Sequence, residues 1–298
     1  MRFTFLAVVG AVLPLCVLLL SQTSQAQTLT CNYTFFAVNN NGAKPTTASG
    51  INSSDTIVGG WFTATENDAA FLRKANGSMS TFSYPGFPTT FFSGINDNGA
   101  IVGAFGRHQA FTDHGFLLQG GKLTPINYPA SIQTVPSGIN NNGAIVGTHW
   151  QSEVDSSGFS LMNGAYTDVR YPNASATSAN AINNLGGIVG DFIDNQQPVP
   201  HIHGFILTNG QFQQVDAPGN NYNTTLTGIN DQGIVTGWYQ QTTDSGGIGF
   251  EYVNGTFKTL VIPNATSVSA SGINSLGDIT GVAVNGKQQL GFLGKNCH

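Results

Sequence analysis

The stretch SGINDNGAIVG, Ser93–Gly103, decides the fold because close copies of it occur six times along the chain. The asparagine of each copy marks the repeat, at Asn52, Asn96, Asn140, Asn183, Asn230 and Asn274. Successive asparagines are 44, 44, 43, 47 and 44 residues apart. A repeat of this length is typical of propellers, solenoids and arrays.

Each repeat has the content of four strands. In the second copy, Asp97-Asn98-Gly99 is a turn, followed by the strand-like stretch AIVGAF, a polar loop and GFLLQ. A turn at Gly120-Gly121 then leads to KLTPINYP, which ends in proline. Four strands in about 44 residues are one propeller blade. No stretch after residue 26 has a sustained 3.6-residue apolar period, so we expect little helix.

The last glycine of the motif is present in every copy. Glycine inside a strand indicates that another backbone or side chain comes close. The first copy has Asp55 where the other copies have the turn glycine, and aspartate tolerates a left-handed backbone better than most residues.

The two ends of the chain predict a closed ring. The sixth repeat stops at QLGFLGKNCH, one strand short, and NYTFFAVNNNGAKPTTA at the other end aligns with the fourth strands. We therefore predict an all-β, six-bladed β-propeller, closed by the N-terminal strand completing the last blade. Cys31 precedes that strand and Cys297 follows the last one, which predicts a disulfide between them.

Residues 1–26 have the features of a signal peptide: Arg2, an apolar run from Phe3 to Leu20, and a small-x-small site ending at Ala26. We expect cleavage near Ala26, a single propeller domain over residues 27–298, and a secreted protein in the extracellular space or periplasm. No second apolar run has membrane length. Charged residues are 8% of the chain and the net charge is −5, which disfavours nucleic acid as a partner.

The repeat resembles a known family. GINxxGxIVG is followed by His114-Gly115-Phe116 and His203-Gly204-Phe205, which is similar to the bacterial extracellular HAF repeat. The other copies have Ala70-Phe71, Gly158-Phe159, Gly249-Phe250 and Gly291-Phe292 at this point, without the histidine. The resemblance implies export and repetition, and no particular activity.

Aromatic residues lead into the variable loops of the repeats, where binding residues usually lie. These candidate ligand-binding residues are Trp61, Phe105, Trp150, Phe192, Trp238 and Tyr239. They could stack on sugar rings, or they could pack between blades; both readings remain open at this point.

Other side-chain patterns are weaker. His201 and His203 have the spacing of a two-ligand metal site on a strand, but no cysteine or glutamate joins them, so we predict no metal and no cofactor. Asp191, Asp194, Glu153 and Asp155 lie beside variable loops without a catalytic motif. The sequence therefore favours a non-catalytic binding module for carbohydrate or a surface polymer. The alternatives are a propeller glycoside hydrolase or lyase using loop carboxylates, and a purely structural or adhesive extracellular protein.

Overall fold

The computed structural model describes residues 27–38, 45–61, 68–107, 113–196, 200–219, 223–242, 245–286 and 288–298. The expected signal peptide, residues 1–26, lies outside the described residues. The described residues form β-strands and no helix, so none of them forms a helix that could cross a membrane. This confirms the all-β prediction.

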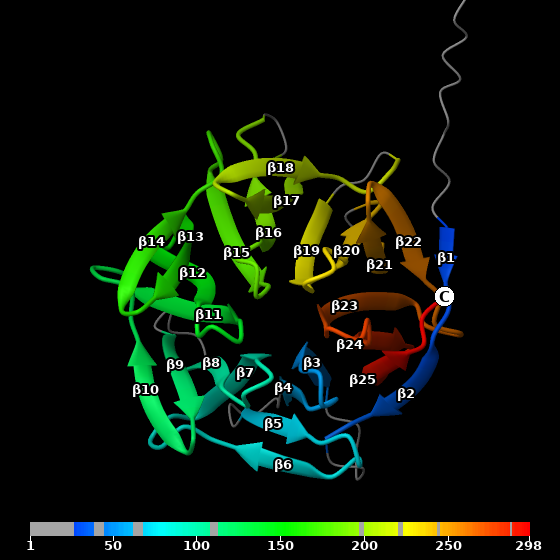
Figure 1. The fold of residues 1–298 in the computed structure, drawn as a ribbon, viewed down its shortest axis with the longest axis horizontal. Coiled ribbons are helices and arrows are strands. Elements are labelled where there is room, and N and C mark those ends of the chain that lie inside the picture. The colour runs from blue at the N-terminus through cyan, green and yellow to red at the C-terminus, as the bar shows by residue number, and fades with distance from the viewer. Residues whose placement is uncertain are drawn as a thin grey trace, which may run out of the picture.

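The strands surround a central axis (Figure 1) and pair into four four-stranded sheets and one nine-stranded sheet. We call the strands of one sequence repeat a unit. The nine-stranded sheet contains the fourth and fifth units, joined by one parallel pair of residues, Ile202 and Asn223. The innermost strands carry the SGIN-type motif: β3 (Thr46–Ile51), β7 (Thr89–Ile95), β11 (Gln133–Ile139), β15 (Ala176–Ile182), β19 (Asn223–Ile229) and β23 (Ser267–Ile273). The second strands carry the IVG-type half: β4 (Ile57–Trp61), β8 (Ile101–Gly106), β12 (Ile145–Ser152), β16 (Ile188–Ile193), β20 (Val235–Gln240) and β24 (Ile279–Asn285).

The third and fourth strands lie farther from the axis. The third strands are β5 (Ala69–Arg73), β9 (His114–Gln119), β13 (Asp155–Met162), β17 (Ile202–Thr208), β21 (Ile248–Val253) and β25 (Gln288–Lys295). The rim strands are β6 (Met79–Phe82), β10 (Lys122–Ile126), β14 (Ala165–Val169), β18 (Gln211–Val215), β22 (Thr256–Leu260) and, for the last unit, β2 (Asn32–Phe36). Neighbouring strands within each unit pair antiparallel.

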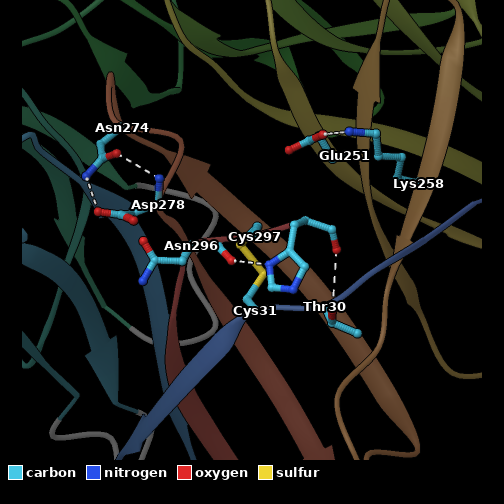
Figure 2. Close-up of a disulfide and its surroundings, with 9 residues drawn as sticks. Thr30, Cys31, Glu251, Lys258, Asn274, Asp278, Asn296 and Cys297 are labelled. Atoms are coloured by element: carbon cyan, nitrogen blue, oxygen red, sulfur yellow. Dashed lines mark hydrogen bonds and ion pairs between the residues drawn. A yellow bond between two sulfur atoms is a disulfide. The ribbon is translucent and has the colours of Figure 1, made fainter.

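The two chain ends meet beside the last unit, as the sequence predicts. β2 pairs antiparallel with β25, with Phe35 opposite Phe292. The predicted disulfide joins Cys31 and Cys297 (Figure 2). Next to it, the backbone N–H of Thr30 donates to the carbonyl of His298 at 3.0 Å, and the reverse bond is 2.9 Å.

One strand at this end is not expected from the sequence. β1 (Gln27–Leu29) pairs parallel with β22, the rim strand of the fifth unit, and Leu29 is only 1% exposed. The segment before the disulfide therefore belongs to the fifth unit, while the segment after it belongs to the sixth. The first ten residues of the described chain tie these two units together.

The core repeats with the sequence. The phenylalanine of each HAF-like triplet is completely buried: Phe71, Phe116, Phe159, Phe205, Phe250 and Phe292. A Cβ placed on Gly147 would lie 2.8 Å from the Phe159 ring and would clash with the carbonyl of Val135. The last motif glycine thus makes room for this ring, which confirms the predicted close approach. Asp55 has a φ of 55°, so aspartate does adopt the left-handed turn conformation there.

Candidate functional site

The motif asparagines meet around the axis. The side-chain amide nitrogen of each donates to the backbone carbonyl of the next motif asparagine, at distances of 2.9 to 3.2 Å. The last of these bonds runs from Asn274 back to Asn52. We call these six residues the asparagine ring: Asn52, Asn96, Asn140, Asn183, Asn230 and Asn274.

Each ring asparagine also holds its own turn. The Oδ1 atom of Asn140, for example, accepts backbone N–H groups of Asn142 at 3.1 Å and Ala144 at 2.9 Å. One buried side chain therefore fixes the turn within its unit and the contact to the next unit. This is the physical reason why asparagine stands at this position in every copy.

The two residues at the start of the motif also contact the next unit. A Cβ placed on Gly50 would lie 3.1 Å from the Cα of Gly94, so the inner strands approach closely. The Ser93 hydroxyl donates to the carbonyl of Pro136 at 2.5 Å, and Thr227 donates in the same way to Ala270 at 2.6 Å. The SGIN stretch is therefore the inner contact between units.

A cavity of about 290 Å³ lies on the axis, next to the asparagine ring. The first three motif residues of every unit line it: 49–51, 93–95, 137–139, 180–182, 227–229 and 271–273. No charged side chain is among these lining residues. The wall consists of hydroxyl groups, isoleucines, glycine backbone and one amide. We call this the axial cavity.

The fourth unit breaks the symmetry of the axial cavity. It carries Asn180 where the other units have serine or threonine, and Asp191 on the adjacent strand. The amide nitrogen of Asn180 donates to Asp191 Oδ1 at 2.7 Å and to the carbonyl of Leu226 at 2.9 Å. Burial raises the pKa of Asp191 to about 6, although its bond from Asn180 lowers it. Asn180 is not among the residues predicted from the sequence, although the fourth copy of the motif departs from the repeat there, with NAIN in place of SGIN.

A second, smaller cavity of about 80 Å³ lies on the axis beside the asparagine ring. Asp97 and Asp231 are among its lining residues. Burial raises the pKa of Asp97, but hydrogen bonds from Asn141 and Ser53 outweigh this and hold it below the ordinary value. These carboxylates serve the contacts between turns, as their positions in the turns predict.

Three of the six predicted aromatic residues are buried. Phe105, Phe192 and Tyr239 are 6%, 4% and 6% exposed. Tyr84 stacks on Phe105, and Tyr171 stacks on Phe192, each with ring centroids 3.6 Å apart. Each tyrosine comes from the preceding unit, so these rings pack between units and offer no free face to a sugar. Trp61, Trp150 and Trp238 are half-buried and keep some accessible surface.

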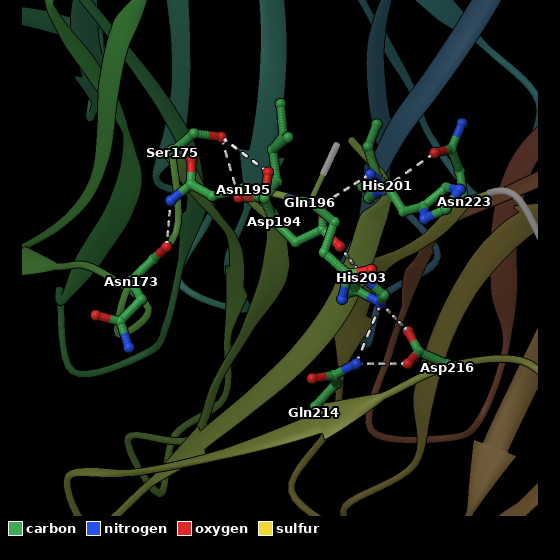
Figure 3. Close-up of polar contacts among 12 residues, drawn as sticks. Asn173, Ser175, Asp194, Asn195, Gln196, His201, His203, Gln214, Asp216 and Asn223 are labelled. Carbon is green, nitrogen blue, oxygen red and sulfur yellow. Dashed lines mark hydrogen bonds and ion pairs between the residues drawn. The ribbon is translucent and has the colours of Figure 1, made fainter. Parts of the chain in front are cut away.

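The rings of His201 and His203, two residues apart in the sequence, are 6.4 Å apart and nearly perpendicular. Both ring nitrogens of His203 face carboxylates, at 2.9 Å from Asp216 Oδ1 and 3.3 Å from Asp194 Oδ2 (Figure 3). Within the described part of the chain, no group of three or more His, Cys, Asp or Glu residues could hold a metal ion.

Asp194 instead fastens the base of the loop that precedes His203 (Figure 3). Its Oδ1 atom accepts the backbone N–H groups of His201 at 3.0 Å and Gln196 at 3.2 Å. Burial raises the pKa of Asp194, but these two bonds and the His203 side chain lower it below the ordinary value overall. The hydrogen bonds of Asp194 therefore link the end of β16 to the start of β17.

Comparisons with known proteins bear on the fold. The sequence matches no family model and no curated protein. A mutant of AofleA from Arthrobotrys oligospora superposes with a TM-score of 0.55 at 12% identity, over 90% of this chain and 88% of that chain. A gluconolactonase from Xanthomonas campestris gives 0.53 at 10% identity, over 91% and 98%.

The β-propeller domain of the Trilobed protease from Pyrococcus furiosus gives a TM-score of 0.50 at 9% identity, over 85% of this chain and 82% of that chain. At such identities these similarities show the fold alone. The chain is an all-β protein whose structural neighbours are β-propellers, and the neighbours include an enzyme.

Proposed function

We propose that the mature chain is a secreted, six-bladed β-propeller of the HAF-repeat type that binds a carbohydrate in the axial cavity. The observation that carries this proposal is the Asn180–Asp191 pair. It is an asymmetric polar group beside a wall that the other five units build from serine or threonine, glycine and isoleucine. A ligand bound on the axis would be oriented by this one unit.

The blade count and the closure are supported by three observations. Six units carry four strands each once β2 is counted with the last unit. The disulfide joins Cys31, the residue before β2, to Cys297, which follows β25. The bond from Asn274 to Asn52 links the sixth unit to the first. With the N-terminal strand counted in the last blade, every unit has four strands.

Export is supported by the disulfide and by the N-terminal segment. Disulfides persist in oxidising compartments and are rare in the cytosol. The apolar run before Ala26 has the length and the flanking residues of a signal peptide. We therefore assign the protein to the periplasm or the extracellular space, where polysaccharides are abundant ligands.

The chemistry of the axial cavity suits a sugar. Its volume of about 290 Å³ is near the lower end of the range of about 300–1,000 Å³ for small-molecule sites. The hydroxyl protons of Ser93 and Thr227 bond to the next unit, so their oxygens can accept hydrogen bonds from sugar hydroxyls, and the isoleucine side chains can contact the C–H faces. Both amide protons of Asn180 are engaged, so its oxygen is left to accept a hydrogen bond. Trp61, Trp150 and Trp238 remain candidates for contacts with a longer glycan.

The test is thermal unfolding of the mature protein against a panel of glycans. A ligand that binds only the folded state raises the melting temperature in proportion to its affinity. The informative variant is Asn180→Ser with Asp191→Ala, because these are the residues that the second unit has at Ser93 and Ala104. At both positions the variant has the residues of the second unit, so we expect it to fold. We also expect that a glycan no longer raises its melting temperature.

The control is Asn98→Ala, in an exposed turn away from the axial cavity. It should retain the full shift. If a glycan raised the melting temperature of the double variant as much as that of the native protein, the binding site would lie elsewhere than in the axial cavity. No shift with any glycan would overturn the carbohydrate proposal and leave a protein partner or a structural role.

A further inference from the structure

Two departures from the repeat and one residue of a rim strand meet at the contact between the second and third units. His149 stands where the neighbouring units have Phe105 and Phe192. Ser131 stands where the next unit has Ala174. Asp168 lies on the rim strand β14. These three residues are scattered over 38 residues of sequence, and none was selected from the sequence.

In the structure they lie next to one another, and His149 Nε2 is buried and makes no hydrogen bond. The Ser131 hydroxyl lies 2.8 Å from Nδ1 of His149. The other ring nitrogen of His149, Nε2, lies 3.5 Å from Oδ1 of Asp168. A carboxylate beside Nε2 favours the proton on that nitrogen, which leaves Nδ1 free to accept from Ser131. The order is hydroxyl, imidazole and carboxylate.

Tyr128 holds the two partners of the serine in place. Its ring stacks on His149 with centroids 3.6 Å apart and an angle of 5° between the planes. Its hydroxyl donates to Asp168 Oδ1 at 2.5 Å. This bond to the carboxylate, together with burial, raises the pKa of Tyr128 to about 12, so the phenol keeps its proton. The stacking therefore sets the plane of the imidazole, and the Tyr128 hydroxyl holds Asp168, whose side chain is 61% exposed.

The protonation of His149 suits a base. The residue is 2% exposed. Burial lowers its pKa below the ordinary value, although Asp168 raises it and Asp155 also faces it. The positive charge of Arg170 lowers the pKa further. At neutral pH the ring is uncharged and can accept a proton.

Ser131 is presented at a strained turn. The preceding residue, Ala130, has a φ of 59°, a left-handed conformation that is uncommon for residues other than glycine. Ser131 itself is half-buried. The following side chain, Ile132, is 44% exposed and gives an apolar surface beside it.

We propose that Ser131, His149 and Asp168 form a second functional site, which hydrolyses esters of small acyl groups. Ser131 Oγ attacks the ester carbonyl carbon while its proton passes to His149 Nδ1. The tetrahedral intermediate collapses, the C–O bond to the alcohol breaks, and the alcohol leaves with that proton. A water molecule then attacks the acyl-serine in the same way and releases the carboxylic acid. Asp168 is a positioning residue for His149.

The substrate class follows from the backbone groups around Ser131. Its own N–H donates to the carbonyl of Tyr128 at 3.2 Å, and the N–H of Ile132 donates to the carbonyl of Trp150 at 2.9 Å. Both are already engaged, so they do not stabilise a developing oxyanion. One missing donor lowers acyl-transfer rates by about 10²–10³-fold. This restricts the site to esters with good leaving groups and excludes amides.

The experiment uses the full mature chain and a fluorophosphonate probe, with peptide mass spectrometry to locate the adduct and p-nitrophenyl acetate to measure hydrolysis. Ser131→Ala should remove both signals. His149→Phe restores the ring found at Phe105 and Phe192, so the stacking on Tyr128 is retained. It should lower labelling and hydrolysis at least tenfold. Ser175→Ala, in the corresponding loop of the next unit, should change neither.

Asp168→Asn tests the positioning role. Because Asp168 raises the pKa of His149, the midpoint of the pH–rate profile should move to lower pH as the rate falls. A merely structural role would leave that midpoint unchanged. The absence of an adduct on Ser131 in the native protein would overturn the proposal, and so would labelling that persists in His149→Phe.

Discussion

The side-chain amide of Asn274 donates to the backbone carbonyl of Asn52, 222 residues earlier in the chain, at 3.2 Å. It is the sixth of six equivalent bonds, and it brings the series back to its first member. The motif therefore repeats because each copy supplies the same contact to the next one. Sequence identity among the copies reflects a shared interface as well as a shared strand.

Removing one ring asparagine should be far more harmful than removing its exposed neighbour. Asn140→Ala loses three hydrogen bonds: the N–H groups of Asn142 and Ala144 lose their side-chain acceptor, and the carbonyl of Asn183 keeps only the bond from the N–H of Gly186. Each buried group left unpaired costs about 1–3 kcal/mol. We expect a loss of about 3 kcal/mol in urea unfolding, against under about 1 kcal/mol for the exposed Asn142→Ala. Equal losses of unfolding free energy in the two variants would show that the asparagine ring stabilises the fold no more than an exposed asparagine does.

The two motif glycines should differ in their tolerance of alanine. Gly147→Ala places a methyl group 2.8 Å from the Phe159 ring and against the carbonyl of Val135, neither of which can move freely. We expect a loss of about 3 kcal/mol or more, or failure to fold. Gly50→Ala should lose about 1 kcal/mol, because the fourth unit carries Ala181 at that position. Equal unfolding free energies for the two variants would contradict this.

The disulfide should stabilise the chain strongly. It joins residues 266 apart, and closing so long a loop is worth about 5–6 kcal/mol in the chain-entropy model. Cys31→Ser with Cys297→Ser should lower the free energy of unfolding by about 2–5 kcal/mol. The native protein in reducing agent should behave in the same way. An unchanged denaturation midpoint would mean that the unfolded chain is not restrained by the bond.

His149 should make the protein less stable in acid. Its folded pKa lies below the ordinary 6.5, so the unfolded chain binds more protons below that pH. The stability it supports is present above pH 6.5 and falls as the pH drops toward the folded pKa. The free energy of unfolding of His149→Phe, measured in paired urea titrations, should therefore rise relative to that of the native protein as the pH is lowered from 7.5 to 5. Phe105→His, the reverse change, should introduce the same loss in the second unit.

Asp191 should make the protein less stable as the pH rises, which is the opposite of the effect of His149. Its folded pKa is about 6 against an ordinary 3.8, so the folded state binds more protons between these values. Stability therefore falls as the pH rises through that window. The full difference is about 3 kcal/mol, and partial solvent access reduces it to about 1–2 kcal/mol. Asp191→Asn should be more stable than the native protein at pH 7.5 and similar at pH 4. A constant difference at both pH values would refute this.

Much of the fold was readable from the repeat. Period, turn glycines and β-branched strands predict four-stranded units because each of these signals is local in sequence. The disulfide and the pairing of β2 with β25 followed from comparing the incomplete sixth repeat with the unpartnered N-terminal segment. The short parallel strand β1 was missed, since three residues carry no periodicity and its partner depends on where the chain passes in space.

The sites were harder to predict. Aromatic residues before loops give the same sequence signal whether they face solvent or pack between units, and Phe105 and Phe192 pack between units. The informative signal was the opposite one, residues that break the repeat. Asn180 and His149 differ from their counterparts in the other units, but only the structure shows which other unusual residues lie beside them.

The pairing of β2 with β25 also orders events in time. β2 leaves the ribosome long before its hydrogen-bonding partner β25. This sheet can therefore be assembled only after β25 has reached the compartment where the chain folds. Formation of the Cys31–Cys297 bond then distinguishes a chain that contains both strands from a product that ends before β25, which keeps a free Cys31 thiol and an unpaired β2.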